Sequence, residues 1–253
     1  MPIDASQPPE ITRTLAATSW LWPGTIEENL LRIADLDLPV RQVALLFYRY
    51  RESLALLGEG LPAPPGLTCH AHLPVDLPWE QGPRAVYAVI ERLMAPPGGL
   101  VPWAGVLHPP ADPADLAGVA SLWRKAAPGW TILIENVPSS GLEEHWPVIR
   151  DLDLSLCLDV GHLMAFGQHR LLDAPDLGRR VELLHVYAPG TEAGTHHHLA
   201  LSALTAKQEP WLRRCLEAAG PETTLLFEVF SEIDLRDSLE TLYKLHARWG
   251  TSA

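Results

Sequence analysis

The chain has 253 residues, 47% of them hydrophobic, which is enough to bury one sizeable core and suits a single α/β barrel of about 250 residues. Its 31 acidic and 19 basic residues give a net charge of −12, which argues against the clustered Lys and Arg surface of a nucleic-acid-binding protein. The sequence shows neither an N-terminal signal nor the roughly 18 consecutive apolar residues of a membrane span, so we expect a cytoplasmic protein that acts on a small molecule.

Apolar runs of strand length alternate along the chain with amphipathic stretches of helix length. Most of the runs are continuous in Val, Ile, Leu and Ala, as is typical of parallel strands covered on both faces. The predicted strands are Thr14–Trp20, Arg41–Phe47, Leu67–Leu73, Ala104–His108, Thr131–Asn136, Leu154–Val160, Val181–Tyr187 and Thr224–Phe230.

Helix starts are indicated between these runs. Thr25–Glu28 and Thr205–Gln208 match the capping box, and Asp112 before a proline is typical of a helix cap. Gly220 and the proline after it end one helix, and the last helix has an apolar stripe. The members of that stripe are Leu235, Leu239, Leu242, Leu245 and Trp249.

This alternation predicts a (β/α)8 TIM barrel made by one domain, residues 1–253, with residues 1–12 as a flexible N-terminal segment. An open doubly wound sheet is the alternative. Such a sheet normally carries a Gly-rich, phosphate-binding turn after its first strand, and Ser19-Trp-Leu-Trp-Pro-Gly24 is not one. The three cysteines are too scattered for a disulfide framework and are expected to be buried thiols.

Acids and histidines gather at the ends of the predicted strands. In a barrel these ends meet at one mouth, so residues far apart in the sequence can share a metal ion. The strand-end residues are His70 and His72, His108, Glu135, Asp159 with His162 just beyond it, His185, and Glu228.

Each of these residues also has an ordinary structural explanation. Glu135 and Glu228 follow apolar runs, where a carboxylate is costly unless it is paired in a salt bridge or bound to metal. His162 could cap a helix and His185 could be a hydrogen-bonded core histidine. His196-His197-His198 lies in a segment whose default interpretation is a surface loop, and which of the three binds metal stays open.

Imidazoles and carboxylates without thiolates suit a divalent Zn, Mn, Fe or Co ion. Two or more such ions, held a few Å apart, would suit hydrolysis of a phosphate ester. Trp20, Trp22 and Trp79 follow the first and third strands and could bind a large flat ligand at the mouth, or pack between loops and helices.

The strand ends resemble those of the xylose-isomerase-like barrel superfamily, which includes sugar-phosphate isomerases and epimerases and the endonuclease IV type of nuclease. Single-metal isomerases of that superfamily use a Glu, Asp, His, Glu set, which Glu135, Asp159, His185 and Glu228 match. The trinuclear nucleases add four histidines, and a further Asp where this chain has about Thr195. The positions that match the added histidines are His70, His108, His162 and His197.

Four segments are more similar still to the cobamide-remodelling phosphodiesterase family (CbiR). They are Ser19-Trp-Leu-Trp-Pro-Gly24, His70-Ala-His-Leu-Pro-Val-Asp-Leu-Pro-Trp79, Ile134-Glu-Asn136, and Cys157-Leu-Asp-Val-Gly-His-Leu163 with Gly167-Gln168. That family hydrolyses the phosphodiester in the nucleotide loop of cobamides, which leaves cobinamide phosphate and releases an α-riboside. The resemblance therefore implies a corrinoid substrate.

The resemblance also implies roles for the individual residues. Glu135 would bridge ions and act in catalysis, with His162 and His197 holding a third ion or steadying the leaving group. The substrate would contact Trp20, Trp22, His72, Asp76 and Trp79. The metal ligands would be His70, His108, Glu135, Asp159, His162, His185, His197 and Glu228. The alternatives are a single-metal sugar-phosphate isomerase or epimerase and a non-catalytic corrinoid-binding barrel.

Overall fold

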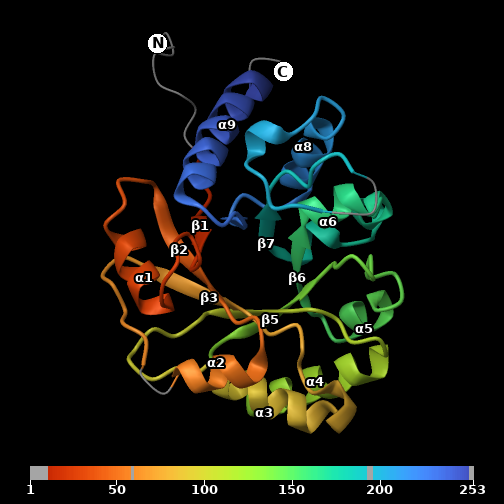
Figure 1. Cartoon of the computed structure of the whole chain (residues 1–253). Helices are drawn as coiled ribbons and strands as arrows, with labels where there is room; N and C mark the ends of the chain where they lie inside the picture. Colours follow the sequence, from red (N-terminus) through yellow and green to blue (C-terminus); the bar gives the residue numbers. More distant parts are fainter. Residues whose placement is uncertain (1–10, 58–59, 193–195, 251–253) are drawn as a thin grey trace, which may run out of the picture.

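A closed barrel of parallel strands, in the order β1-β2-β3-β4-β5-β6-β7-β8, forms the centre of the computed structural model (Figure 1). The structure describes residues 11–57, 60–192 and 196–250. The predicted (β/α)8 barrel is therefore confirmed. Of the expected flexible segment 1–12, residues 1–10 lie outside the described residues.

The strands begin and end close to their predicted bounds. Seven predicted runs contain the observed strand, and β2 begins one residue before its predicted start. Several runs extend past the strand because apolar residues continue into the loops at the mouth. The strands are β1 (Leu15–Thr18), β2 (Val40–Leu46), β3 (Thr68–His72), β4 (Ala104–Leu107), β5 (Thr131–Glu135), β6 (Ser155–Asp159), β7 (Val181–Val186) and β8 (Thr224–Phe227).

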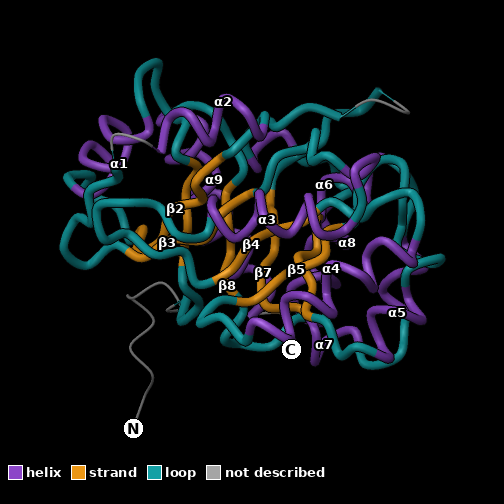
Figure 2. Tube along the Cα trace, turned by 90° about the horizontal axis from the view of Figure 1, so that it is seen from below, coloured by secondary structure: helices purple, strands orange, loops and turns teal. Residues whose placement is uncertain are grey.

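Helices surround the strands on the outside of the barrel (Figure 2). The main hydrophobic core lies between the two layers, because outward strand residues such as Val43, Leu45 and Ile134 pack there with helix residues such as Leu30 and Ile90. The α-helices are α1 (Ile26–Ala34), α2 (Tyr50–Leu56), α3 (Pro83–Leu93), α4 (Pro113–Ala126), α5 (Trp146–Asp151), α6 (Val160–Ala165), α7 (Leu177–Arg180), α8 (Glu209–Ala218) and α9 (Glu232–Gly250). Within the described ranges, no helix is both long and apolar enough to cross a bilayer.

Two of the three predicted helix caps are confirmed. Thr25 Oγ1 accepts from the amide of Glu28 at 3.1 Å, and the Glu28 carboxylate accepts from the amide of Thr25 at 2.7 Å. Asp112 Oδ1 accepts from the amide of Ala114 at 2.8 Å. The predicted box at Thr205–Gln208 is half formed. Gln208 Oε1 accepts from the amide of Thr205 at 2.9 Å, but the Thr205 hydroxyl donates to the same oxygen instead of accepting from an amide, and α8 begins only at residue 209.

The side chains inside the barrel form layers. One layer is apolar and consists mostly of Ala, Val and Leu. Because side chains alternate along a strand, the residues two positions further on point inward again, one step nearer the mouth. Two positions beyond Leu133, Cys157, Leu183 and Leu226 stand Glu135, Asp159, His185 and Glu228. The parity of the strands thus places a ring of ionisable groups directly above an apolar floor.

The cysteines are buried and free, as the sequence predicts. Burial raises the pKa of each thiol to about 12. They are therefore thiols at neutral pH. Cys157 belongs to the apolar floor beneath the mouth.

Candidate metal centre

The four residues that match the isomerase set are brought together at the mouth. Glu135, Asp159, His185 and Glu228 come from the ends of β5, β6, β7 and β8, and each is at most 6% exposed. His185 Nδ1 lies 2.9 Å from Glu135 Oε1, 3.3 Å from Glu228 Oε2 and 3.7 Å from Asp159 Oδ2. Three carboxylates from three strands therefore converge on one imidazole nitrogen.

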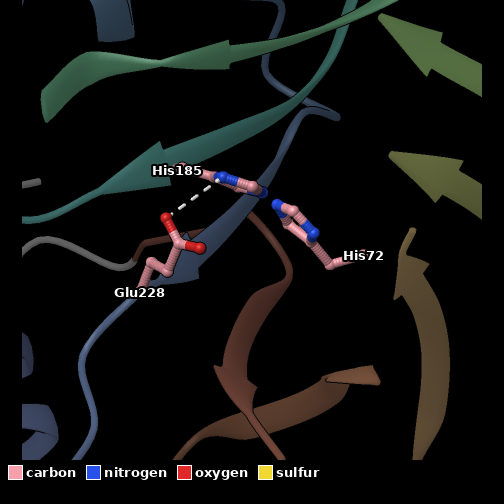
Figure 3. A group of neighbouring side chains, drawn as sticks. All are labelled: His72, His185 and Glu228. Atoms are coloured by element: carbon pink, nitrogen blue, oxygen red, sulfur yellow. Dashed lines mark ion pairs between the residues drawn. The ribbon is translucent and has the colours of Figure 1, made fainter. Parts of the chain in front are cut away.

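A second set of imidazoles approaches Glu135 from the other side. Glu135 Oε2 lies 3.3 Å from His72 Nε2 and 3.0 Å from His108 Nε2. The His72 ring also stacks on His185, with ring centroids 5.7 Å apart, and Figure 3 shows His185 between His72 and Glu228. Glu135 thus presents one oxygen to His185 and the other to His72 and His108, as a carboxylate that bridges two ions would.

The third part of the site is formed by His162 and its neighbours. Strand β6 ends at Asp159, whose Oδ1 caps α6 by accepting from the amide of His162 at 2.6 Å. The His162 ring then lies with Nδ1 2.9 Å from the Asn136 carbonyl oxygen and 3.3 Å from Asp159 Oδ2. Its Nε2 is 3.3 Å from His196 Nε2. The immediate turn from strand into helix therefore brings His162 back over the mouth.

The donor atoms fit divalent metal ions. Glu135 Oε2 and both ring nitrogens of His185 are buried without a hydrogen-bond partner, although carboxylate or imidazole atoms lie within 3.3 Å of Oε2 and Nδ1. Two donor atoms on one zinc ion, each about 2.0–2.2 Å from it, lie about 3.0–3.5 Å apart. The contacts have these separations but lack hydrogen-bond geometry, as expected of ligands that share a cation.

Several overlapping groups of these residues could hold an ion. Among the described residues, several groups of three have donor atoms within 4.8 Å of one another. Glu135, His72 and His185 each belong to more than one group, so neighbouring ions would share ligands. The groups are His72, His185 and Glu228; His72, His108 and Glu135; Glu135, Cys157 and His185; and Glu135, Asp159 and His162.

The charges in the site depend on one another. Burial raises the pKa of Glu135, but His185 and His108 together hold it well below its ordinary value. Burial likewise lowers the pKa of His185, and the Glu228, Glu135 and Asp159 carboxylates together raise it well above 6.5. Without another cation the carboxylates thus retain a proton on His185. Metal binding to such a site releases that proton, because an imidazole binds metal in its neutral form.

Among the described residues His72, and not His70, belongs to the groups whose donor atoms lie close enough together to hold an ion, whereas the sequence assigns His70 as a ligand and His72 as a substrate contact. His70 pairs in register with Ala44 and lies one layer deeper than His72, which pairs with Leu46. The His70 ring is fully buried, its Nδ1 is 2.7 Å from Gln42 Oε1, and burial lowers its pKa well below 6.5. Both residues point inward, but only His72 reaches the mouth.

His196 and His198, rather than His197, face the site. This segment is extended and pairs with residue 188 through Leu199, so successive side chains point to opposite sides. His198 Nε2 lies 3.4 Å from Glu228 Oε2, while His197 is exposed and its amide donates to Pro189. His196 and His198 therefore lie beside the candidate ligands, and the predicted ligand His197 points away from them. Thr195 lies outside the described residues.

The five residues expected to contact substrate lie in different parts of the structure. Trp20 lines the mouth and His72 belongs to the candidate ligands. Trp22 instead packs on α1, with the Arg32 guanidinium 4.0 Å from its ring centroid. The Asp76 carboxylate accepts from the amide of Tyr50 at 2.8 Å, at the start of α2. Trp79 lines a separate cavity that shares His108 with the mouth.

The mouth contains a cavity of about 530 Å³ whose lining combines the candidate ligands with aromatic and aliphatic side chains. None of the described residues that line it is a lysine or an arginine. Of the seven lining residues that are neither acids nor histidines, the sequence interpretation assigned only Trp20 to the site. The lining residues other than the acids and histidines are Trp20, Leu46, Phe47, Tyr48, Val75, Pro138 and Phe230.

Comparison with known proteins shows the fold. No protein-family model matches the chain, and no curated protein matches it in sequence. Similar solved structures include one described as AsfvAP:AG, with a TM-score of 0.59 and 17% identity over 92% of this chain and 98% of that one. SacUVDE aligns with a TM-score of 0.56 and 13% identity over 93% of this chain and 99% of that one.

A third similar structure is a xylose isomerase-like TIM barrel protein from Mycobacterium smegmatis in complex with magnesium. It aligns with a TM-score of 0.58 and 12% identity over 93% of this chain and 97% of that one. This chain has a xylose-isomerase-like TIM barrel fold.

Tyr187 is a further residue of this barrel that the sequence interpretation missed. It is fully buried, its hydroxyl donates to Asp159 Oδ2 at 3.2 Å, and its ring centroid lies 4.2 Å from that of His198. Tyr187 thus holds one carboxylate and supports one imidazole of the site. The space for its ring exists because residue 161 is glycine, since a Cβ there would overlap the phenol ring.

We therefore expect Gly161→Ala to destabilise the protein by about 1–3 kcal/mol, the usual cost of forcing an extra carbon into a packed interior. Urea denaturation of the metal-free protein measures this change. Gly129→Ala is the matched control, because a Cβ at residue 129 meets no atom within 4 Å. Equal unfolding midpoints for the two variants would show that Tyr187 can move aside without cost.

Proposed function

We propose that this protein is a metal-dependent phosphodiesterase that hydrolyses the nucleotide-loop phosphodiester of cobamides to cobinamide phosphate and an α-riboside. The observation that carries the proposal is the position of Glu135, whose two oxygens face two different sets of imidazoles. Divalent ions bound at such neighbouring positions would activate water and neutralise charge that develops on the phosphate. A single-metal centre has no need of the second set, His72 and His108.

In this proposal, the chain's own residues position the reacting groups and move protons. Glu135 holds the two halves of the centre together. The Nε2 atoms of His162 and His196 lie 3.3 Å apart beside the cavity. Because Nδ1 of His162 is 2.9 Å from a backbone carbonyl oxygen and donates to it, its Nε2 is free to accept or hold a proton. These two imidazoles take the place given to His162 and His197 by the sequence, next to the leaving oxygen.

The charge of the cavity favours a phosphodiester over a sugar phosphate. A phosphate monoester carries nearly two negative charges, and proteins commonly bind such groups with Arg or Lys. No described residue of either type lines the cavity. A phosphodiester has one negative charge, which the ions can neutralise, and the rest of the substrate can be uncharged. The net charge of −12 likewise disfavours a polyanion such as DNA.

The proposal is tested by incubating the metal-loaded protein with a complete cobamide and separating the products by chromatography. Cobinamide phosphate and a free α-riboside are expected, and treatment with a chelator should stop their formation until metal is restored. Tight cobamide binding without products would instead favour a corrinoid-binding barrel.

A sugar-phosphate isomerase remains the second candidate, because Glu135, Asp159, His185 and Glu228 alone form its ligand set. The metal content of the purified protein separates the two enzymes. Two or more ions per chain support hydrolysis, and one ion per chain, together with no cobamide cleavage, supports isomerisation.

A further inference from the structure

The mouth of the barrel is divided into two sides. Strands β3 to β8 each supply a candidate ligand at or just beyond the carboxyl end, whereas no described residue at the ends of β1 and β2 is one. Aromatic side chains follow three neighbouring strands: Phe230 follows β8, which also supplies Glu228, and Trp20 and Tyr48 follow β1 and β2. We call these three residues the aromatic shelf, and all three line the cavity that contains the metal ligands.

The aromatic shelf is exposed to solvent. Trp20 is 46% exposed, Tyr48 58% and Phe230 44%. Several large apolar side chains that surround one cavity mark a binding surface more often than chance exposure. Aromatic faces bind flat rings by stacking, without a requirement for charge. The neighbouring lining residues Leu46 and Val75 are also apolar. This side of the cavity therefore suits a flat, uncharged ring.

The shelf is continuous with the metal centre. The ring centroid of Phe230 lies 5.1 Å from that of His198, whose Nε2 is 3.4 Å from Glu228 Oε2. A ring that lies on the shelf is consequently close enough for a short linker, such as one sugar, to carry a phosphodiester to the ions.

The size of the cavity identifies which part of the substrate the shelf binds. Its volume of about 530 Å³ lies within the range of about 300–1,000 Å³ for pockets that enclose drug-sized ligands. A nucleoside fits a cavity of this size, whereas a corrin ring with its amide side chains is larger. We infer that the aromatic shelf binds the base of the α-riboside half of the substrate, while the corrin ring stays outside the cavity. This inference rests on the proposed function.

The test measures binding of the two halves separately, with the metal-free full-length protein. A benzimidazole α-riboside should bind, as measured by calorimetry, and cobinamide should not compete with it. Trp20→Ala and Tyr48→Ala should each weaken binding of the α-riboside by about 10-fold or more, in line with the stacking energy of one base. Tyr48→Phe retains the ring and should bind normally. Leu56→Ala, at a residue as exposed as Tyr48 but outside the cavity, is the control.

The outcomes distinguish this inference from the proposed function. Cobamide cleavage together with α-riboside binding that is unaffected by Trp20→Ala would overturn the shelf and leave the function standing. Binding that depends on Trp20, in a protein that does not cleave cobamides, would support the shelf and overturn the function. Competition by cobinamide would show that the corrin ring occupies the cavity, which contradicts the inference. In steady-state hydrolysis, Trp20→Ala should raise KM and leave kcat nearly unchanged, because the ring lies away from the reacting phosphorus.

Discussion

The variant Glu135→Gln is expected to lose cobamide hydrolysis by at least about 100-fold, since even residues that only orient a metal ligand cost 10–100-fold in metal affinity or activity. The substitution keeps the size of the side chain and removes its charge. It leaves His185 on one side and His72 and His108 on the other without the carboxylate that they share. We therefore also expect fewer ions per chain, as measured by mass spectrometry of the metal content after dialysis.

Glu222→Gln is the matched control for this variant. Residue 222 is exposed in the loop before β8, at the opposite end of the barrel from the mouth, and the change in net charge is the same. Its metal content and activity should equal those of the wild type. Full activity in Glu135→Gln would exclude a bridging role for this carboxylate and, with it, the proposed centre.

The barrel and the central part of the site could be predicted because they follow from local patterns. Continuous apolar runs predict the number of strands. A charged residue at the carboxyl end of such a run is expected at the mouth, because the two layers around the strand are apolar. Glu135, Asp159, His185 and Glu228 were found in this way. The three carboxylates converge on His185 Nδ1 because all four strands are parallel and belong to one closed barrel.

The choice between neighbouring histidines could not be predicted, for two different reasons. His70 and His72 have the same parity, so both point into the barrel, and only the register of β3 against β2 shows which one reaches the mouth. The side chains of His196, His197 and His198 point alternately to opposite sides of their segment. Their orientation depends on the pairing of residue 188 with Leu199, which brings together residues that the sequence gives no reason to pair.

Local contacts explain where Asp76 and Trp22, two residues that the sequence assigns to substrate binding, lie in the structure. Asp76 was expected near the substrate, but its carboxylate satisfies the free amide at the start of α2. Trp22 was expected at the mouth, but the turn after β1 carries it onto α1, where Arg32 covers its ring. In both cases a local partner from an adjacent element competes with the site for the side chain. Motif similarity cannot detect such a partner.

If His72 is a metal ligand, its removal should lower both metal content and hydrolysis. We expect His72→Ala to lower metal occupancy and hydrolysis by about 10–100-fold, because His72 Nε2 lies 3.3 Å from Glu135 and its ring stacks on His185. His70→Ala should instead retain the metal and lose about 2–4 kcal/mol of stability, since it leaves a cavity in the interior and removes the partner of Gln42 Oε1.

The two effects are separated by measuring each variant in two ways, as metal content after dialysis and as the urea midpoint of the metal-free protein. If His70→Ala proves too unstable to purify, His70→Leu fills the same space without a ligand nitrogen and should still bind the normal number of ions. The opposite pattern, with metal lost from His70→Leu and retained in His72→Ala, would return His70 to the ligand set.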